Sequence, residues 1–128
     1  MDDISQVRVL IVDDSETWRA FVTALLKGWG VKTIDIAVSG LQAVQEAREL
    51  QPTLILMDVG LPDLNGIEAA RVIRTLAPKS RILFVSSYSD PDIVQAAFAA
   101  GGRSYVLKSQ APSELLKVIH LALGDEPR

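Results

Sequence analysis

The sequence predicts an α/β fold in which five strands alternate with five helices, (βα)5, and form a doubly wound five-stranded parallel sheet. Apolar runs rich in β-forming residues alternate along the chain with segments of helical periodicity. Three of these runs, VLIV, LILM and ILFV, are apolar without interruption, which is typical of parallel strands covered by helices on both faces. Right-handed crossovers between such strands give a doubly wound sheet. The five predicted strands are Val7–Val12, Thr33–Val38, Thr53–Met57, Arg81–Val85 and Ser104–Leu107.

The first two helices follow from apolar spacing and from a start signal. After the first strand, apolar residues recur at i, i+3, i+4, i+7 and i+8, as on one buried helix face. These residues are Trp18, Phe21, Val22, Leu25 and Leu26. The second helix carries Leu41, Val44 and Ala47, and Ser39 and Gln42 before it have the spacing of a capping box. Trp18 is interpreted as core packing of the first helix.

The third and fourth helices have clear N-terminal signals. Asn65 and Glu68 repeat the capping-box spacing in front of a helix with Ile67, Ala70 and Ile73 on its inner face. Asp90 and Pro91 are typical of an N-cap and a first helical residue. The inward residues of this fourth helix are predicted to be Ile93, Ala96, Ala97 and Ala100.

The fifth helix opens at Pro112 and ends near Gly124. Its apolar face is predicted to comprise Leu115, Val118, Ile119 and Ala122. Since no linker or internal repeat interrupts the alternation, we expect a single domain over residues 1–128 with a core of about residues 7–123.

Composition excludes several classes of protein. The chain has 128 residues, 13 basic and 16 acidic, and a net charge of −3, so no global basic field favours direct binding of nucleic acid or an anionic membrane. It has no cysteine and one histidine, His120, which excludes disulfides, thiolate metal sites and histidine-rich metal sites. No apolar run approaches the roughly 20 residues of a membrane span, and MDDISQ is not a signal peptide. We therefore expect a soluble cytoplasmic domain.

Residues suited to phosphate or metal chemistry follow four of the five predicted strands, whereas the second ends in Ser39 and Gly40 and offers no charge. Asp13 and Asp14 follow the first, Asp58 the third, Ser86 the fourth and Lys108 the fifth. Ligands of open α/β sheets bind outside the carboxyl ends of the strands. One such aspartate alone is most simply a turn former or a helix cap. The combination instead predicts one crevice that holds all five side chains.

Three aspartates in one crevice need a cation. Two carboxylates about 4 Å apart repel by ~4 kcal/mol at an effective dielectric constant near 20. Oxygen ligands with few protein groups favour Mg²⁺, with Mn²⁺ as the alternative. Asp58 is then a candidate nucleophile that forms an acyl phosphate. Lys108 would neutralise the transferring phosphoryl group, and Ser86 would donate a hydrogen bond to it.

Four motifs together resemble the receiver domain of response regulators over nearly the whole chain. They are VLIVDDS at 9–15, LILMDVGLPDLNG at 54–66, ILFVSSYSD at 82–90 and SYVLKSQAPSELL at 104–116. The resemblance implies a flavodoxin-like fold with the strand order 2-1-3-4-5. The final motif is most similar to receivers whose full-length proteins carry a C-terminal LuxR-type helix-turn-helix.

The resemblance also implies a role for each site residue. Asp58 corresponds to the phosphoacceptor, and Lys108 to the lysine that binds the phosphoryl group. The implied metal ligands are Asp13, Asp14, Asp58 and the backbone carbonyl of Gly60. The implied switch residues are Ser86 and Tyr105.

Three positions depart from the family pattern. Ser87 stands where a small alanine or glycine is usual, and Ser109 where many receivers have proline. Gly60 carries no side chain that could obstruct or assist an attacking water. These departures concern the kinetics of the phosphoryl group.

The resemblance implies a phosphoacceptor switch of a two-component phosphorelay, phosphorylated by a sensor histidine kinase with Mg²⁺. The output surface would comprise the fourth helix, the fifth strand and the fifth helix. It would control an effector outside this chain, and DNA would be bound only through that effector. Homodimerisation on phosphorylation is a further expectation, and no membrane is involved. The receiver would promote only its own phosphorylation and dephosphorylation.

Alternative functions make different demands on the sequence. A stand-alone receiver that acts by protein contact fits the same motifs. A phosphatase with an aspartyl nucleophile would need a second aspartate at position 60, where the chain has glycine. A dinucleotide or flavin protein would need G-x-G-x-x-G. A receiver that only binds partners would lack an acidic residue or the lysine, and this chain keeps them all.

Overall fold

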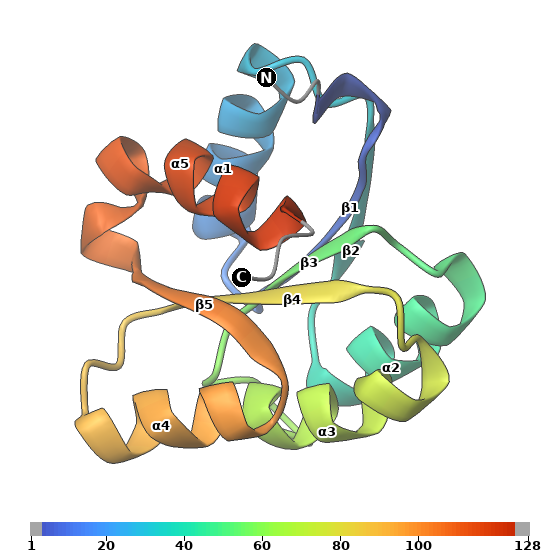
Figure 1. The fold of residues 1–128 in the computed structure, drawn as a ribbon, viewed down its shortest axis with the longest axis vertical. Coiled ribbons are helices and arrows are strands. Elements are labelled where there is room, and N and C mark those ends of the chain that lie inside the picture. Colours follow the sequence, from blue (N-terminus) through green and yellow to red (C-terminus); the bar gives the residue numbers. More distant parts are fainter. Residues whose placement is uncertain (1–3, 125–128) are drawn as a thin grey trace.

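The computed structural model describes residues 4–124 and contains one five-stranded sheet (Figure 1). All neighbouring strands are parallel, and their order is β2-β1-β3-β4-β5. The strands are β1 (Arg8–Val12), β2 (Thr33–Ala37), β3 (Leu54–Met57), β4 (Arg81–Ser86) and β5 (Gly102–Leu107). The predicted fold class and strand order are confirmed.

Five helices cover the two faces of the sheet. Figure 1 shows α1 and α5 on one face and α2, α3 and α4 on the other. The helices are α1 (Glu16–Gly28), α2 (Gly40–Leu50), α3 (Gly66–Leu76), α4 (Pro91–Ala99) and α5 (Ala111–Leu123). Two short 3-10 turns are η1 (Ile4–Gln6) and η2 (Lys108–Gln110). No helix in the described range combines the length and the apolar character that crossing a membrane requires.

The uninterrupted apolar runs follow from burial on both sides of the sheet. In β3, Leu54 and Leu56 belong to the core under α1 and α5. Ile55 and Met57 belong to the core under α2, α3 and α4. Successive side chains of a strand point to opposite faces, so a strand between two helical layers must be apolar throughout.

The predicted helix starts are confirmed at three N-caps. Ser39 accepts a hydrogen bond from the Gln42 N–H at 3.1 Å. Asn65 accepts from the N–H groups of the first turn of α3, and Asp90 does so for α4. In an ideal capping box the side chain of Gln42 would accept a hydrogen bond from the backbone N–H of Ser39. Here it accepts from the N–H of the preceding residue, Val38.

The predicted buried faces are wrong at two positions. Phe21 is 37% exposed on α1, and Leu41 is 59% exposed on α2. The inner face of α2 instead presents Gly40, Ala43 and Ala47. A Cβ at Gly40 would lie 1.8 Å from the Leu64 carbonyl oxygen, so α2 begins in backbone contact with the β3–α3 loop. This close approach turns Leu41 outward.

Candidate functional site

The carboxyl ends of four neighbouring strands carry the predicted site residues. Asp13 follows β1, Asp58 follows β3, Ser86 ends β4 and Lys108 follows β5. The sheet hydrogen bonds continue into the acidic residues, since the Asp13 N–H donates to the Ala37 carbonyl at 3.1 Å and the Asp58 N–H to the Val12 carbonyl at 3.0 Å. The sheet itself therefore sets the backbone positions of both aspartates.

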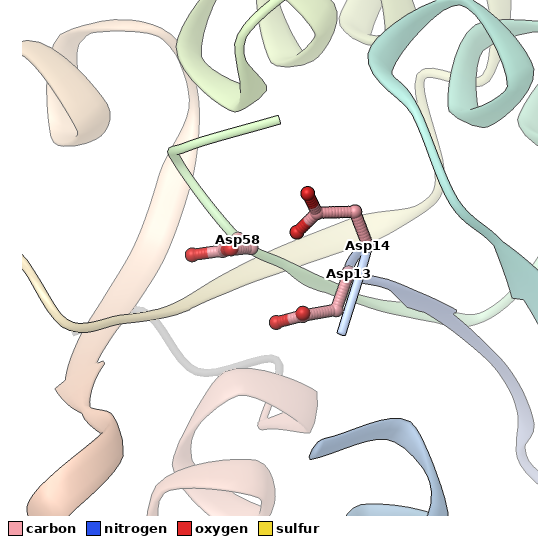
Figure 2. Close-up of side chains that lie close together, drawn as sticks. All are labelled: Asp13, Asp14 and Asp58. Atoms are coloured by element: carbon pink, nitrogen blue, oxygen red, sulfur yellow. The ribbon is translucent and has the colours of Figure 1, made fainter. Parts of the chain in front are cut away.

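Three carboxylates gather at these strand ends. Figure 2 shows Asp13 and Asp14 at the end of β1 beside Asp58. One oxygen of each carboxylate lies within 4.8 Å of those of the other two. Asp13 and Asp58 are buried, whereas Asp14 is exposed. A set of carboxylate oxygens open to solvent on one side fits a hard divalent cation that keeps part of its hydration shell.

The environment of Asp58 favours its protonated form. Its pKa is raised from 3.8 to about 6, chiefly by burial and then by the charge of Asp13. The Lys108 ammonium and the hydrogen bond from the Val59 N–H lower the pKa but do not cancel these effects. The acidic cluster therefore carries an unbalanced charge that a proton or a cation relieves.

Hydrogen bonds orient the two buried carboxylates. Oδ1 of Asp13 accepts from the Ser15 N–H at 2.9 Å, and Oδ1 of Asp58 accepts from the Val59 N–H at 2.9 Å. The Oδ2 atoms face Lys108, whose Nζ lies 2.8 Å from Asp13 and 3.6 Å from Asp58. Lys108 thus joins the two strand ends across the crevice.

Ser86 and Tyr105 are linked through the β4–α4 loop. The Oγ of Ser86, which is fully buried, accepts from the Tyr88 N–H at 3.1 Å. The Tyr105 hydroxyl donates to the Tyr88 carbonyl at 2.7 Å, and its ring stacks on Phe84. Burial raises the pKa of Tyr105, and a hydrogen bond with Ser86 opposes that rise. Ser86 and Tyr105 therefore both hydrogen-bond to the backbone of Tyr88 in the β4–α4 loop.

Tyr88 is a site residue that the sequence analysis missed. Its side chain is about half exposed and lies against Gly60, where a Cβ would be 3.0 Å from the tyrosine Oη. The space that the absent side chain of Gly60 leaves is therefore occupied from the β4–α4 loop. Nothing in the local sequence indicates this contact, because residues 60 and 88 follow different strands. Ser87 and Ser109, the other departures, are exposed.

The comparisons with known proteins agree with this geometry. The family model described as "Response regulator receiver domain" matches residues 9–120. The chemotaxis protein CheY of Thermotoga maritima is 30% identical over 113 residues, which are 88% of this chain and 94% of that protein. Other curated relatives, transcriptional regulators among them, are longer, and the chain spans 23% to 58% of their length.

Solved structures of response regulators and receiver domains are also similar to this chain. A two-component response regulator of the LuxR family from an Aurantimonas species superposes with a TM-score of 0.87 at 33% identity, over 93% of this chain and 86% of that one. The receiver domain of the Arabidopsis thaliana histidine kinase CKI1, complexed with Mg²⁺ and BeF₃⁻, has a TM-score of 0.84 at 26% identity, over 93% and 91%. The match of a family model to most of the chain, on a fold and a cluster of strand-end residues of this kind, shows that the chain belongs to the receiver domains of two-component response regulators.

Proposed function

We propose that Asp58 is the phosphoacceptor and that a sensor histidine kinase is the donor. The observation that carries the proposal is the position of Asp58, whose carboxylate lies within 4.8 Å of the two other acids and 3.6 Å from the Lys108 ammonium. A carboxylate oxygen attacks phosphorus, the bond from phosphorus to the donor imidazole nitrogen breaks, and that nitrogen takes up a proton from water as the neutral imidazole leaves. The product is an acyl phosphate on Asp58.

Asp13, Asp14, Asp58 and the Gly60 carbonyl would hold Mg²⁺, with Mn²⁺ as the alternative. The three carboxylate oxygens within 4.8 Å of one another support this assignment. When bound, the cation supplies positive charge that offsets the repulsion among the carboxylates and the charge of the phosphoryl group. Asp13 also orients Lys108, because their 2.8 Å ion pair holds the ammonium 3.6 Å from Asp58.

Lys108 and Ser86 would respond to the phosphoryl group. The new group adds about two negative charges and three acceptor oxygens. Lys108 would pair with it, and Ser86 would turn its hydroxyl toward it and draw the β4–α4 loop inward. The hydrogen bonds that join Ser86, Tyr88 and Tyr105 support this route from the site to the surface of α4, β5 and α5.

The surface of α4, β5 and α5 would transmit the conformational change to an effector. We propose that residues 1–128 form one receiver domain, with a core of about residues 7–123, and that the full-length cytoplasmic protein binds DNA through a separate domain. The likeness to a LuxR-family regulator and the greater length of the transcriptional regulators among its relatives support this. A homodimer formed on phosphorylation is part of the proposal, as is the absence of catalysis beyond the receiver's own phosphorylation and dephosphorylation.

Acetyl phosphate tests the assignment of Asp58. With Mg²⁺, intact-mass spectrometry should detect one added phosphate on the wild type and none on Asp58→Asn. Asp92→Asn is a matched control, because Asp92 is an exposed aspartate on α4, and this variant should accept phosphate normally. Chelation of Mg²⁺ should stop the reaction. An added phosphate on Asp58→Asn equal to that on the wild type would refute the assignment.

A further inference from the structure

Trp18 lies beside the site in a way that its spacing on α1 did not indicate. The indole is partly buried against the core under α1 and α5, as predicted for a packing residue. It also lies under the Lys108 ammonium, with Nζ 5.1 Å from the ring centroid. This distance is within the range of an attractive cation–π contact.

Lys108 consequently has three neighbours of two kinds. Two carboxylates face its ammonium on one side, at 2.8 Å from Asp13 and 3.6 Å from Asp58. The face of Trp18 is the third neighbour. A lysine side chain is flexible, and fixing it in one arrangement costs rotamer entropy. Trp18 offsets this cost without adding a charge that would compete with the carboxylates.

The indole also lies beside the buried carboxylates. Trp18 lines a cavity of about 10 Å³ together with Asp13 and Asp58. It also lines an open hollow of about 560 Å³ whose wall includes Phe21, Lys108 and Pro112. Trp18 therefore borders both the small cavity beside the carboxylates and the open hollow, onto which Lys108 also faces. The side chain of Lys108 is 18% exposed and that of Asp13 is 2% exposed, so little water reaches their ion pair, and a low local dielectric constant strengthens it.

We propose that Trp18 is a positioning residue that holds the Lys108 ammonium at the site for phosphoryl transfer to Asp58. The proposal rests on the proposed function of Asp58. Lys108 approaches the incoming phosphoryl group from a place where it contacts both the indole and the carboxylates. When Asp58 is phosphorylated, the ammonium gains phosphoryl oxygens as partners and its position over the ring changes.

The rate of phosphorylation separates positioning from packing. Trp18→Leu should slow phosphorylation by acetyl phosphate at saturating Mg²⁺ about fivefold, the size expected for a partly buried cation–π contact. Trp18→Phe keeps an aromatic face and should recover a large part of the rate. Trp29→Phe is the control, since Trp29 packs elsewhere in the same core and should leave the rate unchanged. Thermal melting verifies that each variant is folded.

A double-mutant comparison tests whether Trp18 acts through Lys108. In a Lys108→Met background, Trp18→Leu should have no further effect on the rate. The same fivefold loss in that background would overturn the proposal, as would a Trp18→Leu rate equal to that of the wild type. If the wild type accepts no phosphate, the proposed function fails as well. Normal phosphorylation of the wild type together with an unaffected Trp18→Leu refutes the Trp18 proposal alone.

The fluorescence of Trp18 supplies a measurement that a purely packing role of the residue would not make dependent on Lys108. Because the chain has two tryptophans, a Trp29→Phe variant emits from Trp18 only. Addition of Mg²⁺ and beryllofluoride should change this emission as Lys108 shifts over the ring. Adding Lys108→Met to this variant should abolish most of the change. An identical change with and without the lysine would show that Trp18 does not report on Lys108 and would overturn the proposal.

Discussion

The two helices that flank β5 are held in different ways. α4 has nine residues, and Ala97 is its fully buried side chain. α5 has thirteen residues, and its buried set includes Leu115 and Ile119. Since apolar burial stabilises a helix in proportion to the area removed from water, α5 is anchored and α4 is held weakly. The helix nearer the Ser86 loop is thus the one that moves at the lower cost in free energy.

The largest expected effect is on stability. Leu115→Ala should lower the free energy of unfolding by about 3 kcal/mol, because it leaves a cavity under α5. Ala97→Gly should cost about 1–2 kcal/mol through helix propensity and one lost methyl group. Urea unfolding of both variants measures the difference. Equal losses would show that α4 is anchored as firmly as α5.

The second-largest expected effect is the dependence of stability on pH that the Asp58 carboxyl group causes. An acid whose pKa is about 6 in the folded state and 3.8 in the unfolded state stabilises the fold below about pH 4. That contribution is lost as the pH rises through about 6, and it amounts to about 3 kcal/mol at most. Metal-free wild type should therefore lose stability between pH 4 and 7 relative to Asp58→Asn.

Mg²⁺ should reduce this difference at neutral pH, because it stabilises the folded form that carries the carboxylates. Asp14→Ala should weaken the effect of Mg²⁺. Parallel pH profiles for metal-free wild type and Asp58→Asn would contradict the raised pKa of Asp58.

A smaller effect tests the link between β5 and the β4–α4 loop. Tyr105→Phe removes the hydrogen bond to the Tyr88 carbonyl and should cost about 1 kcal/mol. Hydrogen exchange should become faster in the loop and at the start of α4 but not in α5. Tyr88→Phe is the matched control, since it removes a hydroxyl but keeps the backbone acceptor. Equal acceleration in both helices would contradict the contrast between them.

The finest test follows the conformational change itself. Ser86→Ala should accept phosphate, yet beryllofluoride should produce smaller NMR shifts at Tyr105 and α4 than in the wild type. Ser87→Ala changes an exposed neighbour and should respond like the wild type. A full response in Ser86→Ala would exclude Ser86 as the coupling residue. The movement of α4 would then not depend on the hydroxyl of Ser86.

Local patterns in the sequence were sufficient for the elements and for much of the site. The apolar runs predicted the strands, and Ser39, Asn65 and Asp90 marked helix starts, because these signals act within a few residues. The acids and the lysine could be placed at one edge because parallel strands bring their carboxyl ends together. The strand order came from the resemblance, and the structure confirms it.

Only the tertiary structure decided which side chains meet. The contact of Trp18 with Lys108 and that of Tyr88 with Gly60 join residues that are far apart in the sequence, and no local period encodes them. The exposure of Leu41 follows from the close approach of α2 to the β3–α3 loop. The raised pKa of Asp58 depends on burial and on the Asp13 charge, which exist only once the sheet has formed. Local propensity determines elements, whereas burial and contacts across the sheet determine the chemistry of the site.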